Sequence, residues 1–232
     1  GADGDLRVWD AITFKTRSIY RGHTANFSRA TFSPDGRLVA SCDLRGEIHL
    51  WNPSTGEQFD RIVRQQNLLS VAFMPLCGFS PDSRELAYSD NSQVFRYDVK
   101  QKKVLWSGDN KGRYSFWAVQ YSPDGSLLGA SGANNLVWEI ETGDLIHQHN
   151  VSGDGRERLL GFDSRNNLLK TDLVDGQWEL IALSARGGEV AYRWPFPGPF
   201  YNQSVVPLHL NHSGTLCFIP VELPAAEGGR QM

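Results

Sequence analysis

The sequence predicts an all-β fold built from a repeated unit of about 40–48 residues. Three observations support this prediction. A turn tetrapeptide recurs as Ser33-Pro34-Asp35-Gly36, Ser80-Pro81-Asp82-Ser83 and Ser122-Pro123-Asp124-Gly125. Apolar segments end at a similar spacing, at Trp9, Trp51, Tyr97, Trp138 and Ile181. Seven Trp, twelve Phe and 23 Gly among 232 residues are typical of aromatic strands joined by tight turns.

Residues 22–63 show the unit most clearly. Apolar segments at 38–41 and 48–51 alternate with polar turns, and this spacing is too tight for helices. Because two independent markers keep the same period, the unit is interpreted as a four-stranded blade of a β-propeller.

Further blades follow along the chain. Segments 69–73 and 116–121 are the expected inner strands of the next two blades. Between the first of them and its turn, residues 74–79 are expected to form an insertion, because Pro75 has no N–H to donate to a sheet. Residues 150–194 form a divergent blade, and 195–200 form a stiff Pro-rich loop into two strands at 205–210 and 215–220. We therefore expect a propeller over residues 1–222, with parts 1–20, 22–63, 64–108, 109–149, 150–194 and 195–222, and a flexible tail over 223–232.

The repeat resembles the WD-repeat family. The resemblance rests on the pair Gly22-His23, followed 28 residues later by Trp51-Asn52, and on the recurrence of this unit along most of the chain. In that family, a His before the first strand, a Ser or Thr in the second, an Asp in the next turn and the Trp form one hydrogen-bonded network. The resemblance assigns this structural network to His23, Ser41 and Trp51, and its last two members in the first blade part to Asp3 and Trp9.

One position departs from the family pattern. Arg45 occupies the turn position where the family places the Asp, and Asp43 is near enough in sequence to take its place.

The strand pairs at the two ends of the chain allow two interpretations. The terminal strand pairs could complete a fifth blade, or the chain could be a fragment of a larger, for instance seven-bladed, propeller. Phe218 at the Ser or Thr position favours a fragment.

The arginine at position 45 also suggests a partner-binding face. A long cation at position 45 can point outward from the rim, and other basic and aromatic residues fall in loops on that side: Phe27, Arg64, Lys111, Arg113, Tyr114 and Arg156. Interface hot spots favour arginine and aromatic side chains. A solvated mixed surface is the alternative, since Asp109, Asp154 and Glu157 are interleaved with these residues.

The resemblance implies a non-catalytic scaffold that binds a peptide or protein partner. The alternatives are a catalytic propeller of the hydrolase, lactonase or quinone-dependent dehydrogenase type, or a regulatory domain of a larger signalling enzyme. The sequence contains no Gly-x-Ser-x-Gly, phosphate-loop or His-Glu-x-x-His motif. The pair His147 and His149 is more plainly explained by an exposed strand than by a metal site. We therefore expect no cofactor, metal or small-molecule substrate.

Charge, hydropathy and cysteine content indicate which partners and which cellular compartment to expect. A net charge of −3 gives no strong field for nucleic acid or anionic membranes. The longest apolar run, near 68–74, is far shorter than a membrane span. Cys42, Cys77 and Cys217 are odd in number and form no Cys-x-x-Cys pair, which predicts free buried thiols and favours the reducing cytoplasm.

Overall fold

The structure is a computed structural model that describes residues 5–63, 77–90, 93–109, 116, 118–132, 134–150, 158–196, 209–210 and 217–218. All regular secondary structure in these segments is β-strand, which confirms the predicted fold class. The chain divides into two compact units, Gly1–Asn150 and Val151–Met232. A search of the described residues finds no helix that could cross a membrane.

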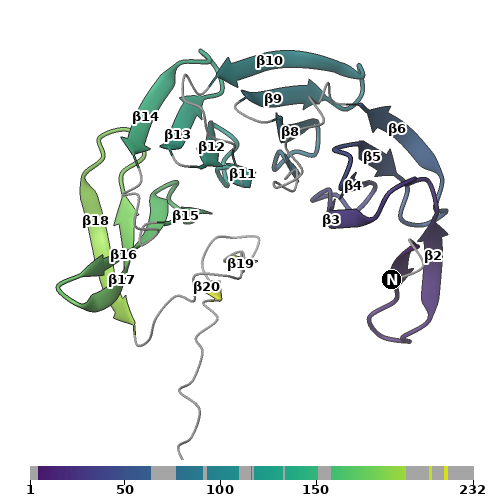
Figure 1. The fold of residues 1–232 in the computed structure, drawn as a ribbon, viewed down its shortest axis with the longest axis horizontal. Helices are drawn as coiled ribbons and strands as arrows, with labels where there is room; N and C mark the ends of the chain where they lie inside the picture. Colours follow the sequence, from purple (N-terminus) through teal and green to yellow (C-terminus); the bar gives the residue numbers. More distant parts are fainter. Residues whose placement is uncertain are drawn as a thin grey trace, which may run out of the picture. The chain divides into compact units, whose positions relative to one another are not determined.

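The first unit consists of successive antiparallel sheets, each formed by strands adjacent in sequence (Figure 1). A two-stranded hairpin contains β1 (Leu6–Trp9) and β2 (Thr16–Tyr20). The next sheet contains β3 (Phe27–Phe32), β4 (Val39–Asp43), β5 (Ile48–Trp51) and β6 (Gln58–Ile62). It is followed by β7 (Cys77–Phe79), β8 (Glu85–Asp90), β9 (Gln93–Asp98) and β10 (Lys103–Asp109). The last sheet of this unit contains β11 (Ala118–Tyr121), β12 (Leu127–Ser131), β13 (Asn134–Glu139) and β14 (Leu145–Asn150).

The second unit repeats the same architecture. Its four-stranded sheet has the order β15 (Arg158–Phe162), β16 (Leu168–Val174), β17 (Gln177–Leu183) and β18 (Val190–Phe196). A short pair follows, formed by β19 (His209–Leu210) and β20 (Cys217–Phe218). These two strands lie within the predicted segments 205–210 and 215–220.

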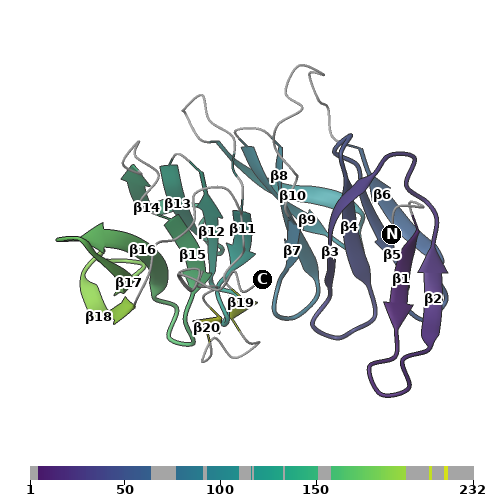
Figure 2. The same cartoon turned by 60° about the horizontal axis from the view of Figure 1, so that its bottom comes forward.

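The hydrophobic core of the first unit lies between neighbouring sheets. Strand β7 contacts β3 and β4 of the preceding sheet and β11 of the following one, so the first strands of successive sheets adjoin (Figure 2). One buried cluster joins β4, β5 and β6 to the β7–β10 sheet, and a second joins that sheet to β11–β14. A smaller cluster of Leu6, Tyr20, Val39 and Trp51 joins the β1–β2 hairpin to its neighbour. This repeated packing of sheet against sheet is what a propeller requires, because each blade buries its faces against the next.

The recurring turn serves a local structural purpose. In the first copy, Ser33 Oγ donates to Asp35 Oδ1 at 2.6 Å, and the same carboxylate oxygen accepts the Arg37 N–H. Asp82 and Asp124 make the corresponding contacts in the next two sheets. The hydrogen bond from Ser33 lowers the pKa of Asp35. The turn carboxylates therefore accept local hydrogen bonds.

Two predicted elements differ from the structure. Residues 77–79 form β7, paired with β8 through Cys77 and Tyr88, and are not part of an insertion. The turn that begins at Ser80 joins β8 to the segment directly before it, which is why residues 77–79 pair with β8. The predicted inner strand at 69–73 lies outside the described residues. Pro195 and Phe196 belong to β18 and not to a loop. Proline is tolerated there because β18 is the last strand of its sheet.

Candidate functional site

The candidate site is the loop between β4 and β5, which carries Arg45. The Arg45 side chain is exposed, and among the described residues its guanidinium takes part in no ion pair. Leu44 beside it is 53% exposed, although its N–H donates to the carbonyl of Asn26 at 2.9 Å. The loop therefore presents a cation and an apolar side chain to solvent while its backbone is fixed to the segment that precedes β3.

Asp43 fixes the backbone of this loop through hydrogen bonds. Its side chain is fully buried, and its Oδ1 accepts the N–H groups of Arg45 and Glu47 at 2.9 and 3.0 Å. Its Oδ2 lies 3.4 Å from His23 Nδ1. Asp43 thus provides a buried carboxylate beside His23, although position 45 carries an arginine.

His23, Ser41 and Trp51 lie within hydrogen-bond distance of one another in a chain. Trp51 Nε1 donates to Ser41 Oγ at 3.1 Å, and Ser41 Oγ lies 2.6 Å from His23 Nε2. Because an indole nitrogen can only donate, the Ser41 hydroxyl is best satisfied by donating to Nε2. The His23 proton then lies on Nδ1, facing Asp43. All of these side chains are at most 1% exposed.

A second histidine extends the cluster toward the hairpin. The ring of His49 stacks on His23 with a centroid separation of 4.0 Å. His49 Nδ1 lies 2.6 Å from the Tyr20 hydroxyl of β2, and its Nε2 lies 3.1 Å from Glu47 Oε2. Arg61 on β6 forms an ion pair with Glu47, and this bond lowers the pKa of Glu47.

Tyr20 connects the hairpin to the sheet in two further ways. Its ring stacks on Trp51 at 4.9 Å with an interplanar angle of 5°, and its hydroxyl oxygen lies 2.8 Å from Gln58 Oε1 of β6. Burial raises the pKa of Tyr20 to about 12. The hydroxyl therefore stays protonated at neutral pH, and its single proton can be donated either to Gln58 Oε1 or to His49 Nδ1. No sequence motif indicated Tyr20, His49, Glu47 or Arg61, because they lie on β2, on β5, in the β4–β5 loop and on β6 respectively.

The electrostatics of the cluster predict a pH effect on stability. Burial and the neighbouring His49 lower the pKa of His23 below its ordinary value of 6.5, and the hydrogen bond to Asp43 opposes this only in part. The unfolded chain therefore takes up this proton at a higher pH than the folded one. The contribution of neutral His23 to the free energy of unfolding is therefore fully present above about pH 6.5 and decreases as the pH falls below that value.

We therefore expect the melting temperature to fall between pH 7.5 and pH 5.5 in a thermal unfolding series. The lowered pKa of Glu47 places that group's contribution at a more acidic pH, outside this window. The variant His23→Gln should show a flatter profile. A wild-type melting temperature that stays constant across the window would contradict the assignment of a buried neutral His23.

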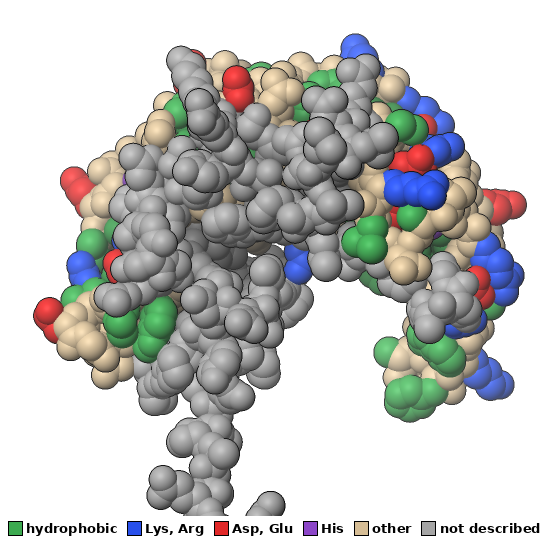
Figure 3. All heavy atoms as spheres, viewed as in Figure 1, with side chains coloured by type: hydrophobic (Ala, Val, Ile, Leu, Met, Phe, Trp, Pro, Cys, Tyr) green, Lys and Arg blue, Asp and Glu red, His purple; other side chains and the backbone are tan. Residues whose placement is uncertain are grey.

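The structure describes few of the other residues predicted for the partner-binding face. Phe27 begins β3, and its backbone pairs with Asp43. Five of the predicted residues lie outside the described residues: Arg64, Lys111, Arg113, Tyr114 and Arg156. The same is true of Asp3 in the predicted network. In the part of the first unit containing β5 and β6, Figure 3 shows Lys and Arg side chains interspersed with Asp and Glu.

Trp9 is far more exposed than the tryptophan at the equivalent point of the next repeat. Its side chain is 59% exposed, whereas the equivalent Trp51 is 1% exposed. The physical reason is the size of the sheet. Within the described residues β1 pairs only with β2, so no further strand of that sheet covers the indole.

In the part of the chain that the structure describes, no group of three or more His, Cys, Asp or Glu side chains could hold a metal ion. His147 lies on β14, the last strand of its sheet.

Comparison with known proteins agrees with this architecture. Residues 14–52, which include β2 to β5 and the whole His23–Ser41–Trp51 chain, match the family described as "WD domain, G-beta repeat". The small ribosomal subunit protein RACK1 of the fission yeast Schizosaccharomyces pombe is 29% identical over 141 residues. The match covers 56% of this chain and 43% of that relative, so the chain spans less than half of the relative's length. The repeated antiparallel sheets and the buried polar chain agree with these similarities, so the chain resembles WD-repeat proteins and its all-β architecture is consistent with a WD-repeat β-propeller.

Proposed function

We propose that this protein is a non-catalytic interaction scaffold that binds a peptide or protein partner through the surface around Arg45. The proposal rests on the β4–β5 loop, where exposed side chains lie on a backbone that a buried side chain holds in place. An exposed Arg45 and an exposed Leu44 stand on a backbone fixed by a fully buried Asp43. A rigid loop loses little conformational entropy on binding, and arginine is a frequent hot-spot residue.

The comparisons support this class of function. WD repeats are shared with a relative named as a small ribosomal subunit protein, so that relative assembles with other macromolecules. Neither comparison supports the hydrolase, lactonase, dehydrogenase or signalling-enzyme alternatives. We propose that the binding face extends over the loops that contain Arg64, Lys111, Arg113, Tyr114 and Arg156, within a propeller over residues 1–222. Cys42 and Cys77 form no disulfide bond, which favours a cytoplasmic setting.

The variant Arg45→Ala should weaken partner binding by about tenfold or more and leave the melting temperature within about 2 °C of the wild type. The matched control is Arg37→Ala, because Arg37 is also an exposed arginine but lies in the β3–β4 turn, at the opposite end of the same strands.

The assay is affinity capture with quantitative mass spectrometry, followed by affinity measurement on the purified partner. Because of the relative's name, sedimentation with purified small ribosomal subunits is the first direct test. Proteins held by the wild type and by Arg37→Ala, and lost with Arg45→Ala, would support the assigned surface. Equal capture by all three proteins would refute it.

A further inference from the structure

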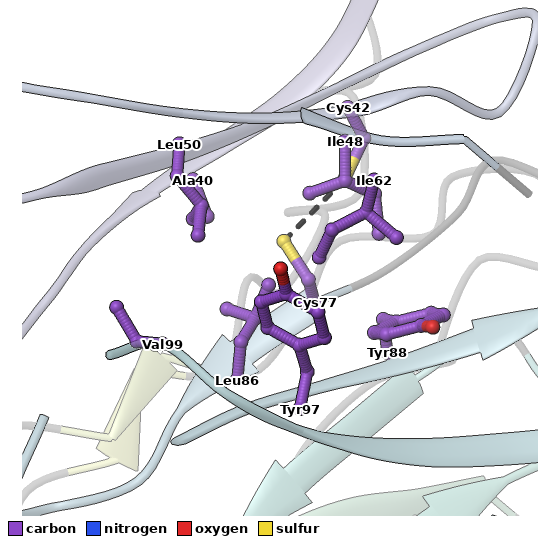
Figure 4. Close-up of a cluster of buried hydrophobic side chains, with 10 residues drawn as sticks. All are labelled: Ala40, Cys42, Ile48, Leu50, Ile62, Cys77, Leu86, Tyr88, Tyr97 and Val99. Atoms are coloured by element: carbon purple, nitrogen blue, oxygen red, sulfur yellow. Dashed lines mark hydrogen bonds between the residues drawn. The ribbon is translucent and has the colours of Figure 1, made fainter. Parts of the chain in front are cut away.

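Two cysteines from neighbouring sheets meet in the core of the first unit. Cys42 lies on β4 and Cys77 on β7, and their Sγ atoms are 3.4 Å apart (Figure 4). Neither cysteine forms a disulfide bond, and the residues are 0% and 8% exposed. They are 35 positions apart in the sequence, so the fold and not the local chain brings them together.

The surroundings hold this pair in place. Cys42 pairs with Arg29 on one side and with Ile48 on the other, and Cys77 pairs with Tyr88. Apolar and aromatic side chains pack around both sulfur atoms, including Ile48, Ile62, Leu86, Tyr88 and Tyr97. A disulfide bond is about 2.0 Å long, so the sulfur atoms would need to approach by about 1.4 Å.

We propose that Cys42 and Cys77 form a reversible disulfide that covalently links the β3–β6 sheet to the β7–β10 sheet under oxidising conditions. The oxidant is a low-molecular-weight disulfide such as oxidised glutathione. This inference is independent of the proposed partner-binding role.

The reaction proceeds by two exchange steps. The thiolate of Cys77, the more exposed residue, attacks one sulfur of the small disulfide, forms a mixed disulfide and releases one small thiol. The Cys42 thiolate then attacks the Cys77 sulfur, forms the Cys42–Cys77 bond and releases the second small thiol. Two protein thiols are oxidised, one small disulfide is reduced to two thiols, and the two protons pass to the released thiolates.

Such a bond would restrict the unfolded chain more than the folded one. It closes a loop that contains β5, β6 and the connection to β7. The bond should therefore raise the melting temperature by roughly 5–10 °C. By the same linkage, the folded protein should form the disulfide roughly a hundredfold more favourably than the urea-unfolded chain at equal glutathione ratios.

The experiment equilibrates the whole protein in glutathione buffers of increasing oxidation, blocks free thiols with an alkylating agent, and maps tryptic peptides without reduction. The three cysteines fall in separate tryptic peptides, 38–45, 65–84 and 194–230, so each pairing has a distinct mass. We expect peptide 38–45 linked to peptide 65–84 in the wild type and in the matched control Cys217→Ala. The oxidised form of each should melt at the higher temperature.

The variants Cys42→Ala and Cys77→Ala should show no rise in melting temperature on oxidation. Because peptide mapping of the wild type needs no variant, a failure of either one to fold leaves the test intact. Glutathione attached to Cys77 alone, a linkage that involves Cys217, or free thiols in the most oxidising buffer would each overturn the proposal.

Discussion

Replacing Trp51 with alanine should lower the free energy of unfolding by about 3–5 kcal/mol, the range for removing a large aromatic side chain from a core. Trp51 is 1% exposed, stacks on Tyr20 and packs with Leu6 and Val39 between the hairpin and its neighbouring sheet. Its indole N–H also donates to Ser41, and the substitution leaves that buried hydroxyl with one partner fewer. Urea unfolding followed by circular dichroism measures the loss.

Trp9→Ala is the matched control for this prediction. Both tryptophans end a strand at the same point of the repeat, but Trp9 is 59% exposed. The Trp9 variant should lose less than about 1 kcal/mol, because only a partly exposed side chain is removed. Equal losses of unfolding free energy in the two variants would contradict the different burial of Trp51 and Trp9.

Replacing His23 with alanine should cost about 1–3 kcal/mol, because it leaves buried polar groups without a partner. The Ser41 hydroxyl loses the acceptor Nε2, and the Asp43 carboxylate loses the neighbouring Nδ1. His49 also loses the ring on which it stacks. The effect is smaller than that of Trp51→Ala because less apolar surface is removed.

Thr24→Ala, at the exposed neighbouring position, is the control for the histidine substitution and should be nearly neutral. If His23→Ala proved as mild as this control in urea unfolding, the hydrogen bonds around Ser41 would contribute nothing to stability.

The sequence predicted the strands well where short-range signals mark them. The Ser-Pro-Asp turns and the Trp51 anchor give strand order, and the strands β4 and β5 lie at the predicted segments 38–41 and 48–51. The prediction was wrong at residues 77–79, which form β7 and not an insertion, and at Pro195 and Phe196, which belong to β18 and not to a loop. Proline disfavours a central strand, but the sequence does not show that β18 is the last strand of its sheet.

The candidate site was only partly predictable. The family resemblance pointed to His23, Ser41 and Trp51, and the structure brings these three residues together. The stacking of His49 on His23, the link through Tyr20 and the Cys42–Cys77 contact join segments 26, 29 and 35 positions apart. No local pattern marks such contacts, because they depend on how one sheet packs on the next.

The role of Asp43 is the most direct point to test, since it explains how the loop stays ordered with an arginine at position 45. A double-mutant cycle of His23→Ala and Asp43→Ala, measured by urea unfolding, isolates the interaction between the two residues. We predict a coupling energy of about 1 kcal/mol or more, so that the double variant loses less stability than the two single losses added together. Losses that add within about 0.3–0.5 kcal/mol would contradict the buried network in which Asp43 supports His23.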